Sequence, residues 1–188
     1  MNKRKTAKYR KSLLMNEYSF NPIYEEYNGI RYFHPGYYLN KTILENGLTI
    51  EQAAKKLPYK TPIEARTKLL IEIISGERNV THTIAEEIAK VFGGSKLLWE
   101  NMQSYYNIAK RKNTLKAFFN DNPDKWYTLK EIWSIEGFRN CTPPTIFNFL
   151  KDLVNEGFLK DDPSFETFSI DDIIGEKKIL EYEVCKKP

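Results

Sequence analysis

Apolar residues recur at helical spacing between residues 47 and 76, and this stretch organises the first half of the chain. Ala53, Ala54 and Leu57 form a small apolar face, and a broader face rich in isoleucine and leucine follows over residues 63–74. This pattern predicts two helices joined by a turn, because each face can bury itself only against a neighbour. The two helices should pack crosswise, as they do in a helix-turn-helix.

Polar residues mark where both helices should begin. Thr49 with Gln52, and Thr61 with Glu64, have the spacing of a capping box, in which a hydroxyl and a longer polar side chain satisfy backbone N–H groups. Pro62 is expected at the first helical position, where its missing N–H costs nothing. The sequence therefore predicts one helix that starts after Thr49 and another that starts at Pro62.

Further helices surround this pair. The same periodicity predicts helices over about residues 38–46 and 82–92, and a last one that starts near Ser95. Upstream, the stretch 18–33 is rich in tyrosine and phenylalanine and has an Asn-Gly turn at 28–29, so it forms either a small hairpin or an extended piece. The first half is thus predicted to be a compact five-helix domain.

The second half begins at a charged junction, residues 110–112, which is expected to be helical rather than a flexible linker. Beyond it, apolar residues predict one short helix over about 115–119. Thr128 with Glu131 also has the spacing of a capping box, which marks the start of another helix. Two helices are therefore expected here.

A third helix and a ribbon complete the second half. Thr142 can cap a helix that begins with Pro143 and ends at Gly157. A strand is predicted over 158–160, followed by a hairpin within residues 166–184. Three helices followed by a two-stranded ribbon make a winged helix. The predicted fold class is therefore mainly α, with a five-helix Cro/repressor-like helix-turn-helix domain followed by a winged-helix (α+β) domain.

Composition is compatible with a folded protein. The chain has 188 residues, of which 41% are hydrophobic, and its net charge of +4 permits an anionic partner without requiring one. Cys141 and Cys185 are the only cysteines, which favours a reducing compartment, and no apolar run approaches a membrane span or a signal-peptide core. A cytoplasmic protein without membrane contact is expected.

No catalytic or metal-binding pattern is present in the sequence. The two histidines, His34 and His82, have no cysteine, serine or carboxylate at a recognisable catalytic or ligand spacing. His34 is expected to be a structural turn residue. Phosphate-binding glycine motifs are also lacking. The chain is therefore predicted to be no enzyme and to need no cofactor and no metal.

Several short motifs together carry a family resemblance. Over about residues 33–112 the chain resembles the HigA-type antidote proteins of toxin–antitoxin modules, within the Cro/repressor-like helix-turn-helix superfamily. The resemblance implies a cytoplasmic DNA-binding repressor that is commonly dimeric and is often paired with a small RNase toxin of the RelE type. The motifs are His34-Pro35-Gly36-Tyr37-Tyr38-Leu39, the segment from Gly47 to Leu57, Ser75-Gly76-Glu77-Arg78, the segment from Ile84 to Phe92, and Leu98-Trp99-Glu100-Asn101-Met102-Gln103.

The chain departs from this family at the helix that would enter the major groove. About six additional residues lie between Leu57 and Gly76, mostly at the N-terminal end of that helix, where base contacts are normally made. Glu64 and Glu72 would face the phosphates unfavourably, so groove reading and a structural or partner-binding role both stay open. If this helix does bind DNA, the candidate residues are Thr61, Arg66, Thr67 and Lys68.

The third helix of the second half offers a better DNA-binding surface. Asparagine can bond adenine through two atoms of its amide, threonine can contact bases or phosphate, and lysine or arginine can neutralise phosphate. The alternative is that these are ordinary polar residues on a solvated helix face, and the acidic predicted wing supports that alternative. The candidates are Arg139, Thr142, Thr145, Asn148 and Lys151.

The expected domains are a basic arm with an aromatic-rich extension (1–32), a HigA-like domain (33–112) and a winged-helix domain (113–188). The arm is either a solvated terminus or a segment that follows the phosphate backbone. Two functions are weighed for the whole chain. The first is a sequence-specific regulator that binds double-stranded DNA, an antitoxin-like repressor. The alternative is a protein-interaction module that holds a toxin or another partner and no longer binds DNA.

Overall fold

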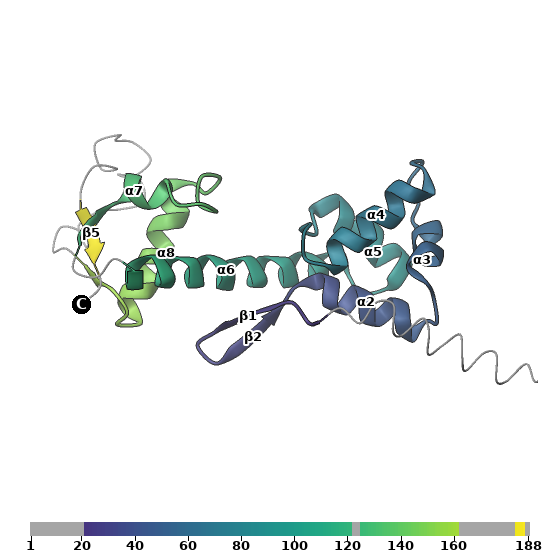
Figure 1. Cartoon of the computed structure of the whole chain (residues 1–188), viewed down its shortest axis with the longest axis horizontal. Coiled ribbons are helices and arrows are strands. Elements are labelled where there is room, and N and C mark those ends of the chain that lie inside the picture. Colours follow the sequence, from purple (N-terminus) through teal and green to yellow (C-terminus); the bar gives the residue numbers. More distant parts are fainter. Residues whose placement is uncertain (1–20, 122–124, 162–182, 187–188) are drawn as a thin grey trace, which may run out of the picture. The chain divides into compact units, whose positions relative to one another are not determined.

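The computed structural model describes residues 21–121, 125–161 and 183–186. The chain divides into two compact units, residues 1–109 and 110–188, and is mainly helical with two small sheets in the part described (Figure 1). The predicted basic arm lies outside the described residues. So does most of the predicted wing, residues 162–182. Within the described ranges, no helix has the length and apolar character that crossing a membrane requires.

A two-stranded hairpin opens the first unit. Strands β1 (Tyr24–Tyr27) and β2 (Ile30–Phe33) pair antiparallel with Tyr27 opposite Ile30, so the loop has two residues. Asn28 and Gly29 both have positive φ, at 51° and 77°, which a two-residue turn of the type favoured by Asn-Gly requires. The hairpin alternative is confirmed.

The His-Pro-Gly sequence fixes the start of helix α2 (Pro35–Glu45). Buried His34 is the N-cap, and its Nδ1 accepts a hydrogen bond from the backbone N–H of Gly36 at 3.1 Å. The helix thus begins three residues before the predicted residue 38, because an imidazole replaces the usual hydroxyl cap. Gly36 packs against the backbone of α4 (Ile63–Ile74), where a β-carbon would overlap the carbonyl of Ile73. His34 is a structural residue, as expected.

Helices α3 (Ile50–Lys56) and α4 form the predicted pair. Thr49 and Gln52 make both hydrogen bonds of the capping box at the start of α3, which confirms that prediction. The capping box expected from Thr61 and Glu64 is wrong. Pro62, with ψ of 152°, is the N-cap of α4, and no side chain caps this helix. The extended conformation of Pro62 moves the helix start one residue beyond the predicted position.

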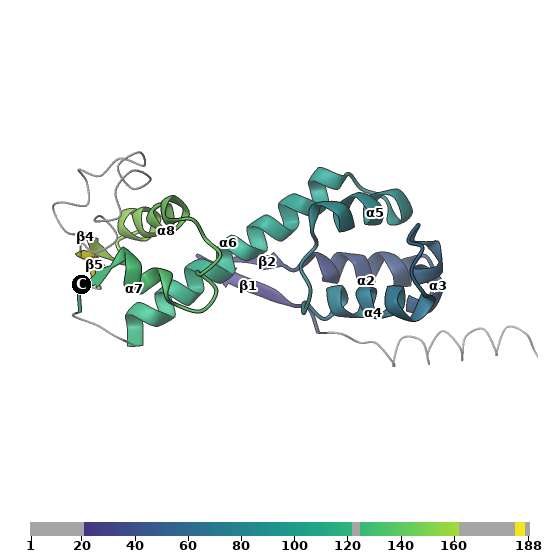
Figure 2. The same ribbon diagram turned by 90° about the horizontal axis from the view of Figure 1, so that it is seen from above.

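Helices α5 (His82–Phe92) and α6 (Lys96–Asp121) complete the first unit, and α6 continues into the second (Figure 2). The short helix predicted over 115–119 is therefore part of one long helix, because the charged junction before it has no helix-breaking residue. The core of the first unit consists of apolar residues from all five helices and the loops between them: Leu39, Ile43, Ile50, Ala53, Ala54, Leu57, Leu70, Ile73, Ile74, Val80, Ile84, Ala85, Ile88 and Trp99.

Two side chains tie α6 to the rest of the first unit. The amide oxygen of Gln103 accepts the backbone N–H of Val80 at 2.7 Å, and its nitrogen donates to Asn79 at 3.1 Å. The indole nitrogen of Trp99 donates to the carbonyl of Gly93 at 3.0 Å. Both residues belong to a motif on which the family resemblance was based. Their hydrogen bonds give them a structural role in this chain.

The second unit has its own core and sheet. Strand β3 (Tyr127–Thr128) leads directly into α7 (Leu129–Trp133), whose capping box between Thr128 and Glu131 is confirmed. Helix α8 (Pro143–Asn155) follows, and Gly157 ends it with a φ of 71°. Strands β4 (Lys160–Asp161) and β5 (Glu183–Lys186) pair antiparallel, and the sheet order is β3-β5-β4. Strand β3 has no counterpart in the sequence prediction.

The close approach of Gly36 to α4 yields a prediction about stability. Replacing Gly36 by alanine should lower the free energy of unfolding by about 3 kcal/mol, because the added carbon meets rigid backbone rather than a side chain that can move. Gly47 is the control, since it has φ of 66° with open space around it, and Gly47→Ala should lose only about 1 kcal/mol. Urea unfolding measures both. Equal losses would contradict the packing described.

Candidate nucleic-acid interface

Helix α8 has one fully apolar face and one polar face. The apolar face lies in the core of the second unit, where Ile146, Phe147, Leu150 and Leu153 are all buried. Opposite them, Asn148, Lys151 and Asn155 are exposed, and Thr145 is half-buried at the edge of the same face. These four polar positions recur at intervals of three or four residues. They therefore form one stripe along the helix.

The start of α8 offers no backbone donors to an anion. Thr142 is the N-cap, and the next two residues, Pro143 and Pro144, have no N–H group. The N–H of Thr145 donates to the carbonyl of Thr142 at 3.0 Å, and the two threonine hydroxyls lie 2.8 Å apart. The predicted hydroxyl cap on the backbone is therefore absent. Any phosphate at this end must be bound by side chains rather than by the N–H groups that usually bind anions at a helix start.

The charge on this face is positive. Residues 139–151 include two cations, Arg139 and Lys151, and no acidic residue. The next residue along, Asp152, is neutralised by Lys112 at 2.8 Å. Glu156 is bridged by Lys112 at 3.4 Å and by Lys116 at 3.2 Å. Because α6 supplies these cations, the carboxylates of α8 do not oppose an anionic ligand at its polar stripe.

The charged and amide side chains predicted to bind DNA in the second unit are available for contacts with a ligand. Arg139 and Asn148 are exposed and make no hydrogen bond or ion pair with another described residue. Lys151 makes no ion pair within the described ranges, and its ammonium lies 5.5 Å from the ring centre of Phe147. A ring beneath the ammonium restrains the side chain without neutralising its charge. Thr145, Asn148 and Lys151 therefore lie on one side of α8, Thr142 lies at its start, and Arg139 is exposed three residues before that N-cap.

The candidates on α4 are arranged differently. Arg66 is half-buried and donates from Nη1 to the carbonyl of Leu57 at 3.1 Å, so it ties the end of α3 to α4. Its Nε, like the hydroxyl oxygen of Thr67, is buried without a hydrogen-bond partner among the described residues. Thr61 is exposed in the loop that precedes α4. Arg66 thus has one nitrogen bonded to the protein's own backbone, and both residues have a buried polar atom, although each also lines a groove beside α4.

Lys68 is exposed, but it belongs to a local ion-pair network. Its ammonium lies 3.7 Å from Glu72, which is also bonded by Arg78 at 2.6 Å. Lys68 and Glu72 therefore form an ion pair between residues four apart on α4. Such exposed pairs contribute only about 0.3–0.5 kcal/mol each. Their main effect here is to balance the charge of this face.

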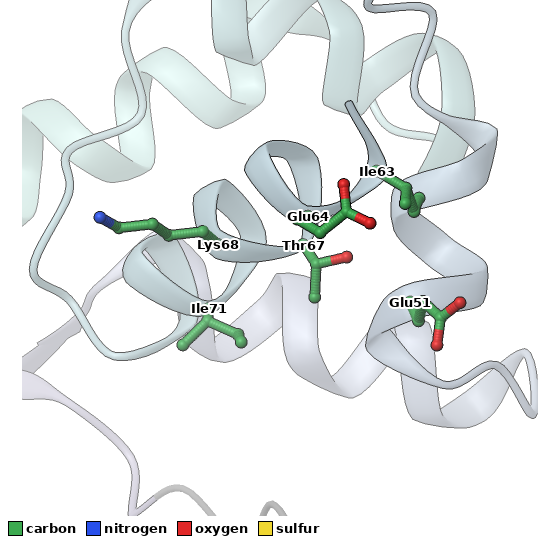
Figure 3. Close-up of a pocket in the computed structure, with 6 residues that line it drawn as sticks. All are labelled: Glu51, Ile63, Glu64, Thr67, Lys68 and Ile71. Carbon is green, nitrogen blue, oxygen red and sulfur yellow. The ribbon is translucent and has the colours of Figure 1, made fainter. Parts of the chain in front are cut away.

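A shallow groove of about 500 Å³ runs beside α4, lined by both apolar and acidic residues. Figure 3 shows that Thr67, Lys68 and Ile71 project from α4, whereas Glu51 comes from α3. The carboxylates of Glu51 and Glu64 lie toward one end, and the ammonium of Lys68 points away from them. Glu51 is paired with Lys55 at 3.0 Å, so the groove has little net charge, and its apolar members, Ile63 and Ile71, suit a protein side chain better than a phosphate.

A second groove, of about 490 Å³, lies on another side of α4 and includes Tyr59, Thr61 and Thr83. Burial raises the pKa of the Tyr59 hydroxyl, and the charge of Glu87 raises it further. The phenol is therefore neutral at physiological pH and adds no charge to the groove. The groove is also lined by three cations, Arg66, Lys68 and Arg78, and by one acid, Glu72.

No metal centre is found in the part of the chain that the structure describes, where no three His, Cys, Asp or Glu side chains gather. His82 is exposed and lies between two charged groups. Its Nδ1 is 2.6 Å from a carboxylate oxygen of Glu100, and its Nε2 contacts the ammonium of Lys96. This chain of polar contacts joins the start of α5 to the start of α6.

The pairing of Lys112 with α8 was not predicted from the sequence. Lys112 was predicted only as one of three cations at a domain junction, yet it is buried and contacts the carboxylates of Asp152 and Glu156. The spacing of Asp152 and Glu156, four residues apart on one side of α8, is the signal that could have indicated a cationic partner.

Comparison of the chain with family models, with curated proteins and with solved structures returned no match.

The inward position of Arg66 predicts a structural role. Arg66→Ala should lower the free energy of unfolding by about 1.5–3 kcal/mol, because it leaves the Leu57 carbonyl without its charged donor. Lys68→Ala, a change of a neighbouring exposed cation, should stay within about 0.5 kcal/mol. Denaturant unfolding of the two variants checks this. A stable Arg66→Ala protein would contradict it.

Proposed function

We propose that this chain is a sequence-specific regulator that binds double-stranded DNA through α8. The observation that carries the proposal is the polar stripe of α8, which combines hydrogen-bonding side chains with Lys151. It lies within residues 139–151, which also include Arg139 and contain no acid. An apolar helix face that is buried in a stable core holds such a stripe rigidly outward. This is what a helix inserted into a major groove needs.

The architecture of the second unit supports a winged-helix fold. The C-terminal part of α6 is followed by strand β3, helices α7 and α8, and an antiparallel pair of strands, with sheet order β3-β5-β4. In such a fold the last helix enters the groove and the ribbon lies beside it. We assign these roles to α8 and to the pair β4–β5.

Each of the five candidate side chains in the second unit has a distinct part in the proposed complex. Asn148 is near the middle of α8 and can bond adenine through both its amide oxygen and nitrogen. Arg139 and Lys151 lie outside the apolar face and neutralise phosphates, with release of counterions. Thr145 and Thr142 offer hydroxyls to bases or phosphates at the helix start. Asn148 therefore contributes selectivity, and the two cations contribute affinity.

The first unit supports a second candidate function, that of a protein-interaction module. We assign α3 and α4 to a helix-turn-helix. In its second helix Arg66 bonds the carbonyl of Leu57 and the Thr67 hydroxyl is buried, and a partly apolar groove lies beside it. These features favour a partner protein, such as a basic toxin of the RelE type, over DNA at this unit. A chain that binds DNA with one unit and a toxin with the other would act as an antitoxin-like repressor. This proposal assigns no chemical reaction to the chain.

Selection from a random duplex library, followed by binding at several salt concentrations, tests the DNA-binding proposal. Affinity should fall steeply with salt, because cations of the protein replace counterions. Asn148→Ala should reduce discrimination at one base pair by about 1–3 kcal/mol, whereas Lys151→Ala should weaken binding to all sequences and reduce the salt slope by about one.

A matched variant makes this test specific. Lys41→Ala removes an exposed lysine of the first unit. It should leave the selected sequence and the affinity unchanged. Failure to bind any duplex at low salt would reject the DNA-binding proposal and favour the protein-interaction module.

A further inference from the structure

The second groove beside α4, of about 490 Å³, has both apolar and charged walls. Its volume lies within the range of small-molecule pockets in proteins, which suits one small ligand. Four segments contribute to it, namely the loop before α4, α4 itself, the loop after it and the start of α5. They supply, in that order, Tyr59 and Thr61, Leu69, Arg78, and Ile84.

The lining of this groove has a net positive charge. Three cations, Arg66, Lys68 and Arg78, line it together with one acid, Glu72, so two positive charges remain. The carboxylate of Glu72 is already held by Arg78 at 2.6 Å and by Lys68 at 3.7 Å. The groove therefore attracts an anion.

Both arginines have donors left for a ligand. The Nη1 atom of Arg66 donates to the carbonyl of Leu57, and the Nε atom of Arg78 donates to Glu72. These bonds restrain the two guanidinium groups. The Nη2 group of Arg66 and both terminal nitrogens of Arg78 make no hydrogen bond with another described residue. Their planar, forked arrangement matches the oxygens of a phosphate or a carboxylate.

Three hydroxyl groups add neutral donors to the lining. The hydroxyl of Tyr59 stays protonated because burial raises its pKa. It makes no hydrogen bond with a described residue, and the same holds for the hydroxyls of Thr61 and Thr83 in this groove. Glu87, which acts on Tyr59 from outside the lining, is itself paired with Lys90 at 3.6 Å. The donors thus outnumber the acids that could oppose an anion.

We propose that this groove binds a phosphate monoester of a small apolar or aromatic group. Such a phosphate carries about 1.5–2 negative charges at pH 7, which matches the net charge of the lining. A carboxylate or the phosphate diester of a nucleic acid would balance one of these charges. The organic part of the ligand lies on the apolar wall, at Leu69 and Ile84. This site goes beyond the proposed function and does not depend on DNA binding by α8.

Titration of the full isotopically labelled chain with phenyl phosphate, followed by amide NMR, tests this site. Saturable shifts should occur at residues 59–61, 65–72 and 78–84, with a dissociation constant on the order of 1 mM. Inorganic phosphate should bind about tenfold more weakly, because it makes no contact with the apolar wall. Phenol, which has the ring without the charge, should give no saturable shift at these residues.

Two variants examine the charge of the groove. Arg78→Gln should raise the dissociation constant of phenyl phosphate about tenfold or more, because a charged donor is lost. Arg31→Gln is the matched control, since Arg31 is also exposed and also bonds a glutamate, Glu26, through Nε, but lies in the hairpin. It should leave binding unchanged. Thr83→Glu adds an acid in the first turn of α5, where it suits the helix, and should weaken binding by a similar factor.

Thermal unfolding establishes that each variant is folded. The proposal is overturned if roughly 20 mM phenyl phosphate gives no shift at these residues, or if inorganic phosphate binds as tightly. It is also overturned if folded Arg78→Gln and Thr83→Glu proteins bind phenyl phosphate as the wild type does. Shifts at the groove with a DNA duplex, but none with phenyl phosphate, would make it a DNA contact and reject the monoester.

Discussion

The burial of one face of α8 in the core of the second unit is the constraint from which the proposed function follows. Any rotation of the helix about its axis would expose apolar side chains that are now buried, namely Ile146, Phe147, Leu150 and Leu153. Their packing therefore fixes that rotation. That rotation decides that Asn148 and Lys151 point outward. Burying four large apolar side chains contributes roughly 6–12 kcal/mol before the entropy of folding is subtracted, far more than any contact of the polar stripe could offset. The surface offered to a ligand is thus set by packing.

Helix α6 has a second influence on that surface. Its residues Lys112 and Lys116 neutralise Asp152 and Glu156, which would otherwise give α8 a row of acidic groups. Removing buried Lys112 would take the nearest cation from Asp152, whereas Glu156 would keep Lys116 at 3.2 Å. The same helix shapes the electrostatics of one unit and contributes Trp99 and Gln103 to the other.

Much of the fold could be predicted from local sequence signals. The capping boxes at Thr49 and Thr128 depend on residues close in sequence and were predicted correctly. The Asn-Gly turn is also local, and it allowed the hairpin as one of two alternatives. The prediction failed where the signal was ambiguous or distant. The Thr61–Glu64 spacing suits a capping box, but the extended Pro62 starts the helix later. The single long α6 was predicted as two helices because a charge cluster was taken for a boundary.

The candidate site was also predictable where it depends on local signals. The helical periodicity of the apolar residues indicated which side of α8 is buried and therefore which side is polar. Periodicity could not indicate that Arg66 reaches back to the Leu57 carbonyl, nine residues away, or that Lys112 neutralises Asp152. Both depend on how distant segments meet. His34 and Gln103, which lie in the motifs on which the resemblance was based, have structural roles here.

Titration of the isotopically labelled chain with a selected DNA duplex, followed by amide NMR, tests the central claim most directly. The account predicts that the largest shifts at low salt occur at residues 139–151, including the side-chain amide of Asn148, and that residues 63–74 of α4 stay unchanged. Shifts confined to α4, or none on α8 at saturating duplex, would contradict it.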